Sequence, residues 1–322
     1  MNVQATRYVI ITPVRNEIVH IAATLRSVSG QTIRPVRWII VDDGSTDGTT
    51  AVLRESAAQN PWIRVVQRAD RGSRLSATGV IEAFEDGYQA LDLDDWDFLV
   101  KLDGDLSFAP TYFEQCFEAF ERDPKLGIAG GVICHDHNGQ LQPEPTPAFH
   151  VRGATKIYRH ECWRAIGGLL RAPGWDTVDE LKANMLGWKT YTLNGLNLLH
   201  HRHTGAADGS WRNAVKDGIA DYVSGYHPLF MALKCVKRLV QRPRVVGSAG
   251  LLYGYIAGRW RQVPQAEAAV VQFVRQQQLR KLSFRTNLWS RPIFTVATSS
   301  TDKTILNFAT DPAKSSDERG KL

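Results

Sequence analysis

The stretch "LVKLDGDLSF" (residues 99–108) joins an apolar run to two aspartates, Asp103 and Asp105, separated by a single residue. Aspartate is a poor strand former, and two carboxylates this close repel each other. One interpretation is that an aspartate here caps the helix that follows. The other is that both carboxylates bind one divalent cation, because Mg²⁺ and Mn²⁺ prefer oxygen ligands and would remove the repulsion. The surrounding sequence distinguishes between the helix cap and the cation site.

Short apolar segments alternate with helical patterns on both sides of this stretch. Runs rich in β-branched and aromatic residues predict strands at 7–14, 37–44, 62–68 and 96–105. Apolar residues at a spacing of three to four predict helices at 17–28, 45–59, 77–91 and 110–123. This alternation predicts an α/β fold with a doubly wound, mostly parallel sheet and helices on both faces.

Polar clusters follow all four predicted strands, at residues 13–17, 42–45, 68–74 and 103–105. In a doubly wound sheet, ligands bind beyond the carboxyl ends of the strands. We therefore expect the four clusters to converge on one crevice. This convergence favours the cation site over the helix cap for Asp103 and Asp105.

The pattern changes after residue 131. The polar, proline-containing segment 135–147 predicts a loop, and 153–168 predicts a strand and a short helix ended by glycines. A helix is expected at 174–190, a strand at 190–205 and further helices from 211 to about 280, before a polar, loosely ordered tail. We expect a nucleotide-binding half at 1–131, a catalytic half at 132–210, a helical region at 211–298 and a tail at 299–322.

The composition excludes several classes of protein. The chain of 322 residues is 43% hydrophobic and 22% charged, which is ordinary for a globular protein. Its net charge of +6 suits an anionic substrate or membrane surface better than a dedicated role in nucleic-acid binding. The four cysteines form no CxxC pair and predict buried thiols in a reducing compartment. Without a signal peptide or a membrane-spanning run, we expect a cytoplasmic protein, peripheral at the inner face of the membrane.

Two of the polar clusters suit a nucleotide. In "VDDGSTDG" (41–48), Asp42 and Asp43 would either cap a helix or accept hydrogen bonds from a nucleobase. In "RADRGSR" (68–74), Arg68, Arg71 and Arg74 either form a solvated loop or bind a diphosphate through bidentate hydrogen bonds. Next to Asp103 and Asp105 at the same sheet edge, the binding role is favoured.

Three motifs, "VIITPVRNE" (9–17), "VDDGSTDGT" (41–49) and "VKLDGDLSF" (100–108), together resemble family 2 glycosyltransferases of the GT-A fold over about residues 7–200. The resemblance implies inverting transfer from a UDP- or GDP-linked sugar with Mn²⁺ or Mg²⁺. By this resemblance the residues that would bind the nucleotide and its ribose are Pro13, Asn16, Glu17, Asp43 and Asp103. Asp42 would support the turn that carries Asp43, and Asp103 and Asp105 would bind the metal, with Asp105 the surer ligand.

The general base is less well defined by the resemblance. Such enzymes carry an acidic motif before a helix that ends in glycine and an aromatic residue, but "GWDTVDELKANMLGW" (174–188) departs from that wording. Asp179 and Glu180 match it locally, whereas the usual helix length counted back from Gly187 reaches Asp176. We favour Asp179, with Asp176 and Glu180 as alternatives. The other interpretation is that these acids only stabilise a helix N-terminus.

The histidines of "LLHHRHTG" (198–205) are candidates for a third metal ligand, which is common in GT-A enzymes. His200, His201 and His203 all qualify by type, and strand alternation does not choose among them. Arg202 would reach the diphosphate, and Asp208 and Arg212 are weaker candidates for contacting phosphates. A tetrahedral zinc site is disfavoured because no Cys or His pair with ligand spacing accompanies them.

The segment 226–262 mixes apolar, aromatic and basic residues, which is typical of an interfacial helix on anionic lipid but also of ordinary packed helices. It resembles the C-terminal part of bacterial family 2 enzymes that build exopolysaccharides or lipid-linked glycans. A lipid-linked or other glycan acceptor is therefore expected. Without a QxxRW motif or spanning helices, a processive polymerase is disfavoured.

Three alternatives remain from the sequence. The first, within the same class, is transfer of the sugar to a polyprenyl phosphate. The second is a nucleotidyltransferase, which usually shows a glycine-rich segment with a lysine that "TPVRNE" (12–17) lacks. The third is a non-catalytic nucleotide-sugar-binding protein, against which the carboxylates at 103–105 and 176–180 argue.

Overall fold

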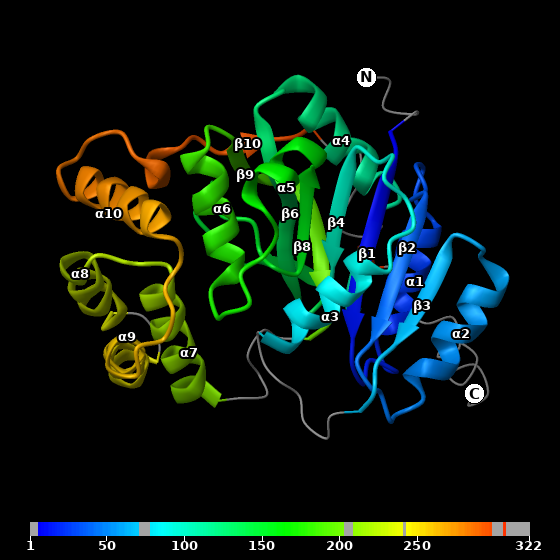
Figure 1. The fold of residues 1–322 in the computed structure, drawn as a ribbon, viewed down its shortest axis with the longest axis horizontal. Helices are drawn as coiled ribbons and strands as arrows, with labels where there is room; N and C mark the ends of the chain where they lie inside the picture. Colours follow the sequence, from blue (N-terminus) through cyan, green and yellow to red (C-terminus); the bar gives the residue numbers. More distant parts are fainter. Residues whose placement is uncertain (1–5, 71–77, 203–208, 241–242, 298–304, 307–322) are drawn as a thin grey trace.

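A computed structural model describes residues 6–70, 78–202, 209–240, 243–297 and 305–306 of the chain. A ten-stranded sheet forms its centre, with the strand order β10-β9-β6-β8-β4-β1-β2-β3, while β5 pairs with β9 and β7 with β6 (Figure 1). The strands are β1 (Tyr8–Val14), β2 (Arg37–Asp42), β3 (Ile63–Gln67), β4 (Phe98–Leu102), β5 (Leu106–Phe108), β6 (Leu126–His137), β7 (Gln140–Pro143), β8 (Thr155–Arg159), β9 (Lys189–His200) and β10 (Phe294–Thr295).

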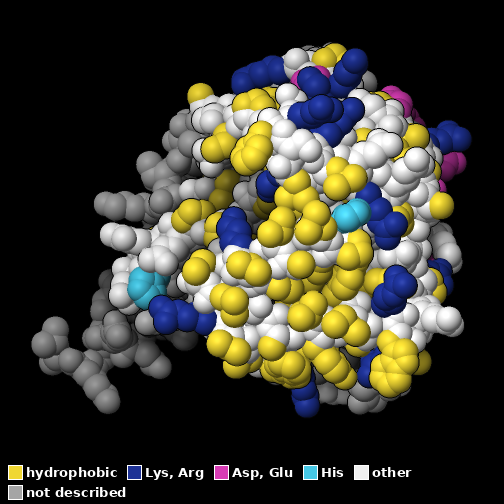
Figure 2. All heavy atoms as spheres, turned by 90° about the vertical axis from the view of Figure 1, so that its left-hand side faces the viewer, with side chains coloured by type: hydrophobic (Ala, Val, Ile, Leu, Met, Phe, Trp, Pro, Cys, Tyr) yellow, Lys and Arg dark blue, Asp and Glu magenta, His cyan; other side chains and the backbone are white. Residues whose placement is uncertain are grey.

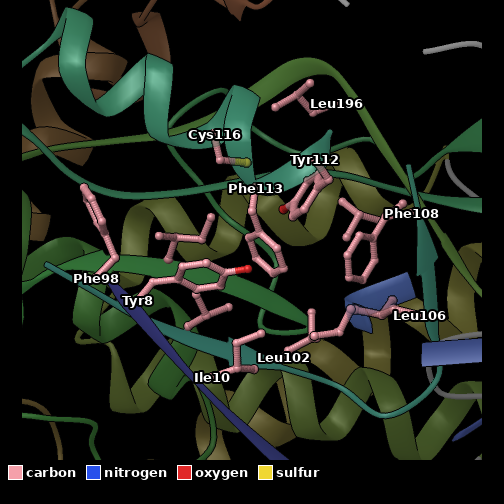
Figure 3. Close-up of a cluster of buried hydrophobic side chains, with 14 of the residues drawn as sticks. Tyr8, Ile10, Phe98, Leu102, Leu106, Phe108, Tyr112, Phe113, Cys116 and Leu196 are labelled. Atoms are coloured by element: carbon pink, nitrogen blue, oxygen red, sulfur yellow. The ribbon is translucent and has the colours of Figure 1, made fainter. Parts of the chain in front are cut away.

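Helices cover both faces of this sheet, as predicted. The helices are α1 (Ile21–Ser29), α2 (Thr49–Gln59), α3 (Thr78–Gln89), α4 (Tyr112–Arg122), α5 (His160–Ile166), α6 (Trp175–Met185), α7 (Gly209–Val223), α8 (Pro228–Arg238), α9 (Arg244–Trp260) and α10 (Ala268–Leu282). Alternation along β1 sends Tyr8 and Ile10 to the core under α1, α2 and α4, shown in Figure 3, and Val9 and Ile11 to the core under α3, α5 and α6.

The first half of the chain follows the expected topology, since β4, β1, β2 and β3 are neighbours and run parallel. The second half is mixed, because β8 runs antiparallel to both β4 and β6. Strand β4 also ends at Leu102, so that residues 103–105 form the turn into β5 rather than the end of the strand.

One prediction for the second half was wrong, and another lies mostly outside the described residues. Residues 135–147, predicted as a loop, belong largely to a hairpin in which β7 pairs with the end of β6. Its turn is Asn138 and Gly139, both with positive φ (55° and 79°), the pair that a tight hairpin turn favours. The expected tail at 299–322 lies outside the described residues except for Ile305 and Leu306, and Ile305 is buried against Ala109 and Leu199.

Helices α7 to α10 form a layer beside the sheet, on the left in Figure 1. Helices α7 and α9 touch backbone to backbone, since a Cβ built on Gly218 or Gly254 would lie 2.1 Å from a carbonyl oxygen of the other helix. Helix α10 joins this layer to α6 through Val270 and Val274, which pack with Val178 and Leu181. Among the residues that the structure describes, no helix is long and apolar enough to cross a membrane.

Candidate active site

A cavity of about 230 Å³ opens at the carboxyl ends of β1 and β4. Five of the predicted site residues line it: Pro13, Glu17, Asp43, Asp103 and Asp105. They come from three of the four polar clusters, so the expected convergence is observed for these clusters. Arg71 and Arg74, from the fourth cluster, lie outside the described residues.

The turn after β2 is built by Asp42 and Asn16, neither of which lines the cavity. Asp42 is buried, and its carboxylate accepts a hydrogen bond from the backbone N–H of Ser45 (2.9 Å) and one from the Thr50 hydroxyl. The Asn16 side-chain oxygen accepts a bond of 2.8 Å from the backbone N–H of Thr46. These contacts fix the turn that presents Asp43 to the cavity.

Asp43 is held from two sides. Its backbone N–H donates to the carbonyl of Val14 (2.9 Å), and its carboxylate pairs with Arg68 Nη1 at 2.7 Å. Arg68 also pairs with Asp86 at 2.7 Å. In this structure Arg68 therefore orients Asp43, whereas the sequence suggested a contact with the diphosphate.

Asp105 lies among positive charges. Its Oδ2 is 3.3 Å from Nε2 of His200 and 4.0 Å from Nε of Arg202, which also pairs with Glu17 at 2.5 Å. Burial alone would raise the pKa of Asp105, but the hydrogen bond with His200 and the charges of His200 and Arg202 outweigh it and lower the pKa. The carboxylate is therefore ionised at neutral pH, as a metal ligand has to be.

His200, rather than His201, faces the aspartate pair. Neighbouring residues of a strand point to opposite sides, and Nε2 of His201 instead shares a hydrogen bond of 2.8 Å with the Ser107 hydroxyl. The His201 ring stacks on His20, and its burial lowers its pKa to about 4. His203, the third candidate, lies outside the described residues, as does Asp208.

The residues at this point fit a divalent cation. Ligand atoms of Asp103, Asp105 and His200 all lie within 4.8 Å of one another. Nδ1 of His200 is buried and has no hydrogen-bond partner in the described part of the chain. The two carboxylates suit Mn²⁺ or Mg²⁺.

His200 also belongs to a second cluster, with His135 and Glu144, whose ligand atoms meet the same 4.8 Å limit. This cluster could not be predicted from the sequence, because the β6–β7 hairpin brings His135 near Glu144 and the pairing of β6 with β9 adds His200. Glu144 pairs there with His135 at 2.6 Å and with Arg152 at 2.8 Å. These contacts account for the cluster as an ion-pair network beside the site.

Lys101 is a cavity residue that the sequence analysis missed. It is 2% exposed, its ammonium pairs with the Asp103 carboxylate, and it donates a hydrogen bond of 2.6 Å to the carbonyl of Gly153. A lysine inside the apolar run "FLVKL" (98–102) was the available signal, because a buried lysine needs a partner. Lys101 thus positions Asp103 at the cavity.

The side chains of Asp179 and Glu180 are fully buried and form ion pairs and hydrogen bonds with their neighbours. Lys156 contacts Asp179 at 2.8 Å and Glu180 at 2.9 Å, and the Tyr158 hydroxyl donates to Asp179 at 2.6 Å. Burial, offset only in part by Lys156, and the neighbouring Glu180 raise the pKa of Asp179 to about 6. With His150, 2.9 Å from Glu180, these side chains form a buried cluster of two cations and two acids.

Asp176 lies differently, in the first turn of α6, next to residues that line the cavity but not among them. It is partly exposed, next to Trp175, whose ring lines the cavity. A Cβ built on the cavity residue Gly153 would lie 3.3 Å from that of Asp176. Lys156 donates to the Asp176 backbone carbonyl, but within the described residues no hydrogen bond or ion pair reaches its carboxylate. Asp176 is the most accessible of the three candidate bases.

The buried cluster makes Lys156 critical for stability. Lys156→Met is expected to lower the free energy of unfolding by about 3–5 kcal/mol, because Asp179 and Glu180 lose their shared cation without regaining water. Denaturant unfolding measures this loss. Lys182→Met, which breaks a pair with the exposed Glu267, serves as the control and is expected to cost no more than about 1 kcal/mol. Equal losses in both variants would refute the cluster's structural role.

His150 is expected to make stability depend on pH. Burial would lower its pKa, but the charge of Glu180 and their hydrogen bond outweigh it and raise the pKa. The resulting stabilisation is complete below the unfolded pKa of about 6.5 and is lost as the pH rises through the higher folded value. His150→Gln should therefore lose less stability than the wild type as the pH rises above about 6.5. Identical slopes in denaturant titrations would argue against this.

The mixed sheet, with the carboxylates that follow β4 and His200 of β9 beside them, has the arrangement of the GT-A fold. Residues 9–169, half of the chain, match the family model described as glycosyl transferase family 2. The chain therefore belongs to glycosyl transferase family 2.

Curated relatives match over a shorter stretch. A chondroitin synthase of Escherichia coli is 31% identical over 114 residues, which are 35% of this chain and 15% of that protein. A hyaluronan synthase of Pasteurella multocida is 29% identical over 114 residues, 35% of this chain and 11% of its own length. The chain thus spans only a small part of these relatives.

Two solved structures share the fold. The mannosyltransferase PcManGT from Pyrobaculum calidifontis, in complex with GDP-Man and Mn²⁺, is similar over 94% of this chain and 80% of its own, with a TM-score of 0.52 and 16% identity. TarS from S. aureus is similar over 87% of this chain and 52% of its own, with a TM-score of 0.51 and 14% identity. At these identities the likeness shows the fold alone.

Proposed function

We propose that this glycosyltransferase moves a sugar from a UDP- or GDP-linked donor to an acceptor hydroxyl, with inversion at the anomeric carbon and with a divalent cation. The observation that carries the proposal is the grouping of Asp103, Asp105 and His200 next to Asp43 at one cavity. A nucleotide-diphospho-sugar requires a cation for its diphosphate and a hydrogen-bond acceptor for its base. The carboxylates of Asp103 and Asp105 suit the cation, and the carboxylate of Asp43 suits the base.

The donor would lie across the carboxyl ends of the strands. Asp43 would accept hydrogen bonds from the base, with Pro13 and Glu17 beside it in the cavity. Asp103, Asp105 and His200 would hold Mn²⁺ or Mg²⁺, which supplies positive charge to the diphosphate as it departs. Arg202, close to Asp105, would add to this charge. The complex of PcManGT with GDP-Man and Mn²⁺ is consistent with such a donor.

We assign the general base to Asp176 rather than to Asp179 or Glu180. A base needs a free carboxylate within reach of the substrate proton. Asp179 and Glu180 have no exposed side-chain surface and are paired with Lys156, whereas Asp176 is partly exposed beside the cavity residue Trp175. Asp176 would take the acceptor proton as the hydroxyl oxygen attacks the anomeric carbon from the side opposite the diphosphate, which inverts its configuration.

The acceptor that we propose is a lipid-linked glycan, in cell-envelope or exopolysaccharide synthesis at the cytoplasmic membrane face. Its support is the basic, apolar helical layer beside the site and the similarity to chondroitin and hyaluronan synthases. The same layer would serve a polyprenyl-phosphate acceptor, which is the second candidate. The family match removes the case for a nucleotidyltransferase.

The experiment for this proposal incubates the full chain with UDP- and GDP-sugars, Mn²⁺ and either a polyprenyl-diphosphate sugar or a polyprenyl phosphate. Proton NMR of the product then gives the anomeric configuration. Inversion with cation-dependent release of UDP or GDP is the expected result. Retention of configuration, or equal release after the cation is chelated, would refute the proposal.

A further inference from the structure

Helices α8 and α9 each expose a row of large apolar side chains. On α8 and just after it, Leu229, Leu233, Val236 and Val240 recur at intervals of four, three and four residues, which places them on one side of a helix. On α9, Val245, Leu252, Ile256 and Trp260 recur at intervals of seven and four residues. We call these eight residues the α8–α9 face.

The inner sides of the same helices already have packing partners. Met231 and Cys235 of α8 pack with Leu251 and Tyr255 of α9, and the Ser248 hydroxyl donates to the Cys235 carbonyl at 2.9 Å. The two helices therefore form one unit with its apolar rows outside. Figure 2 looks onto this side and shows hydrophobic side chains gathered across it. A contiguous apolar patch of this extent marks an interaction surface, whereas single exposed apolar residues scattered over a protein surface are ordinary.

The charged residues in the sequence around the α8–α9 face are all basic. From residue 222 to 266 the sequence contains no Asp or Glu, but seven basic residues: Lys234, Lys237, Arg238, Arg242, Arg244, Arg259 and Arg261. Lys237, Arg244, Arg259 and Arg261 are exposed. In Figure 2 Lys and Arg side chains surround the apolar ones, and acidic side chains are visible only near the edge of the view.

From these observations we propose that the α8–α9 face docks on an anionic lipid bilayer. The apolar rows would enter the boundary between headgroups and acyl chains, and the basic side chains would contact lipid phosphates. A second copy of this chain is a poorer occupant, because a two-fold interface would bring like charges together. The docking itself does not depend on the acceptor, but its use in delivering a lipid-linked acceptor rests on the proposed function.

Helix α7 connects this face to the acceptor side of the site. It packs against α9 through Gly218 and Gly254, and its Ala220 lies under the start of α6, 3.0 Å from a Cβ built on Gly174. Helix α6 begins with Trp175, which lines the cavity, and Asp176 follows it. Docking of α8 and α9 would therefore fix the distance between the lipid surface and the proposed base.

Sedimentation with vesicles tests the docking. The full chain is expected to sediment with phosphatidylcholine vesicles that contain phosphatidylglycerol, at low ionic strength, and much less with phosphatidylcholine alone or at high salt. Leu233→Ser and Lys237→Glu should each weaken binding roughly tenfold. Their matched controls are Leu186→Ser, since Leu233 and Leu186 are both 47% exposed, and Lys125→Glu, another exposed lysine. The controls should bind like the wild type.

Three results would overturn the proposal: no sedimentation of the wild type at low salt, equal losses in the controls, or a dimer in analytical ultracentrifugation that Leu233→Ser dissociates. Calorimetric binding of UDP and GDP with Mn²⁺ on the same samples separates the two proposals. Intact nucleotide binding without vesicle binding would refute only the docking, and vesicle binding without nucleotide binding would refute only the proposed function.

Discussion

Asp176→Asn is expected to lower kcat for sugar transfer by about 10²–10⁴-fold while donor binding stays unchanged. The amide keeps the size of the side chain but cannot take the acceptor proton. Asp176 suits this substitution because no hydrogen bond or ion pair within the described residues reaches its carboxylate, so that the fold should tolerate the change. Steady-state kinetics together with calorimetry of donor binding provide the measurement.

The comparison variant for this prediction is Asp179→Asn. Asp179 is buried between Lys156 and Tyr158, so its replacement should mainly lower the free energy of unfolding. If folded Asp179→Asn lost transfer while Asp176→Asn kept it, the assignment of the base to Asp176 would be wrong.

Asp105→Asn is expected to reduce cation-dependent transfer by at least about 10²-fold, with the fold intact. Asp105 contributes to the candidate metal group with Asp103 and His200 and pairs with His200 at 3.3 Å. A neutral amide is a weaker ligand for Mn²⁺ or Mg²⁺ than a carboxylate is. With the cation bound less tightly, the departing diphosphate loses the positive charge that stabilises it. Transfer rates measured over a series of Mn²⁺ concentrations, with circular dichroism as a check on folding, test this expectation.

Asp94→Asn, the same substitution at an exposed position away from the cavity, is the control and should behave like the wild type. Undiminished turnover of Asp105→Asn at every Mn²⁺ concentration would show that the cation is held elsewhere or is not needed.

The sequence predicted strands β1 to β4 well because their signals are local. Strands β1 to β4 are short apolar runs with polar residues directly after them, and the carboxyl ends of neighbouring parallel strands must meet at one edge. The meeting of Asp43 with Asp103 and Asp105 follows from this rule alone. The antiparallel direction of β8 could not be predicted in this way, because strand direction in a mixed sheet depends on long-range pairing.

The choice among neighbouring acids and histidines needed three-dimensional information. Asp176, Asp179 and Glu180 are all acids near one helix start, and only the position of Lys156 on β8 shows which two are buried. His200 and His201 are adjacent in the chain, and only the register of β9 against β5 turns His200 toward Asp105. The hairpin turn at Asn138 and Gly139, by contrast, was readable from its Asn-Gly pair.

The most direct test of the proposed donor site is calorimetric binding of UDP and GDP to the full chain, with and without Mn²⁺. One of the two nucleotides is expected to bind the wild type more tightly when Mn²⁺ is present, and Asp105→Asn is expected to remove this enhancement. Binding of neither nucleotide, or an enhancement by Mn²⁺ that survives in Asp105→Asn, would contradict the proposed donor site.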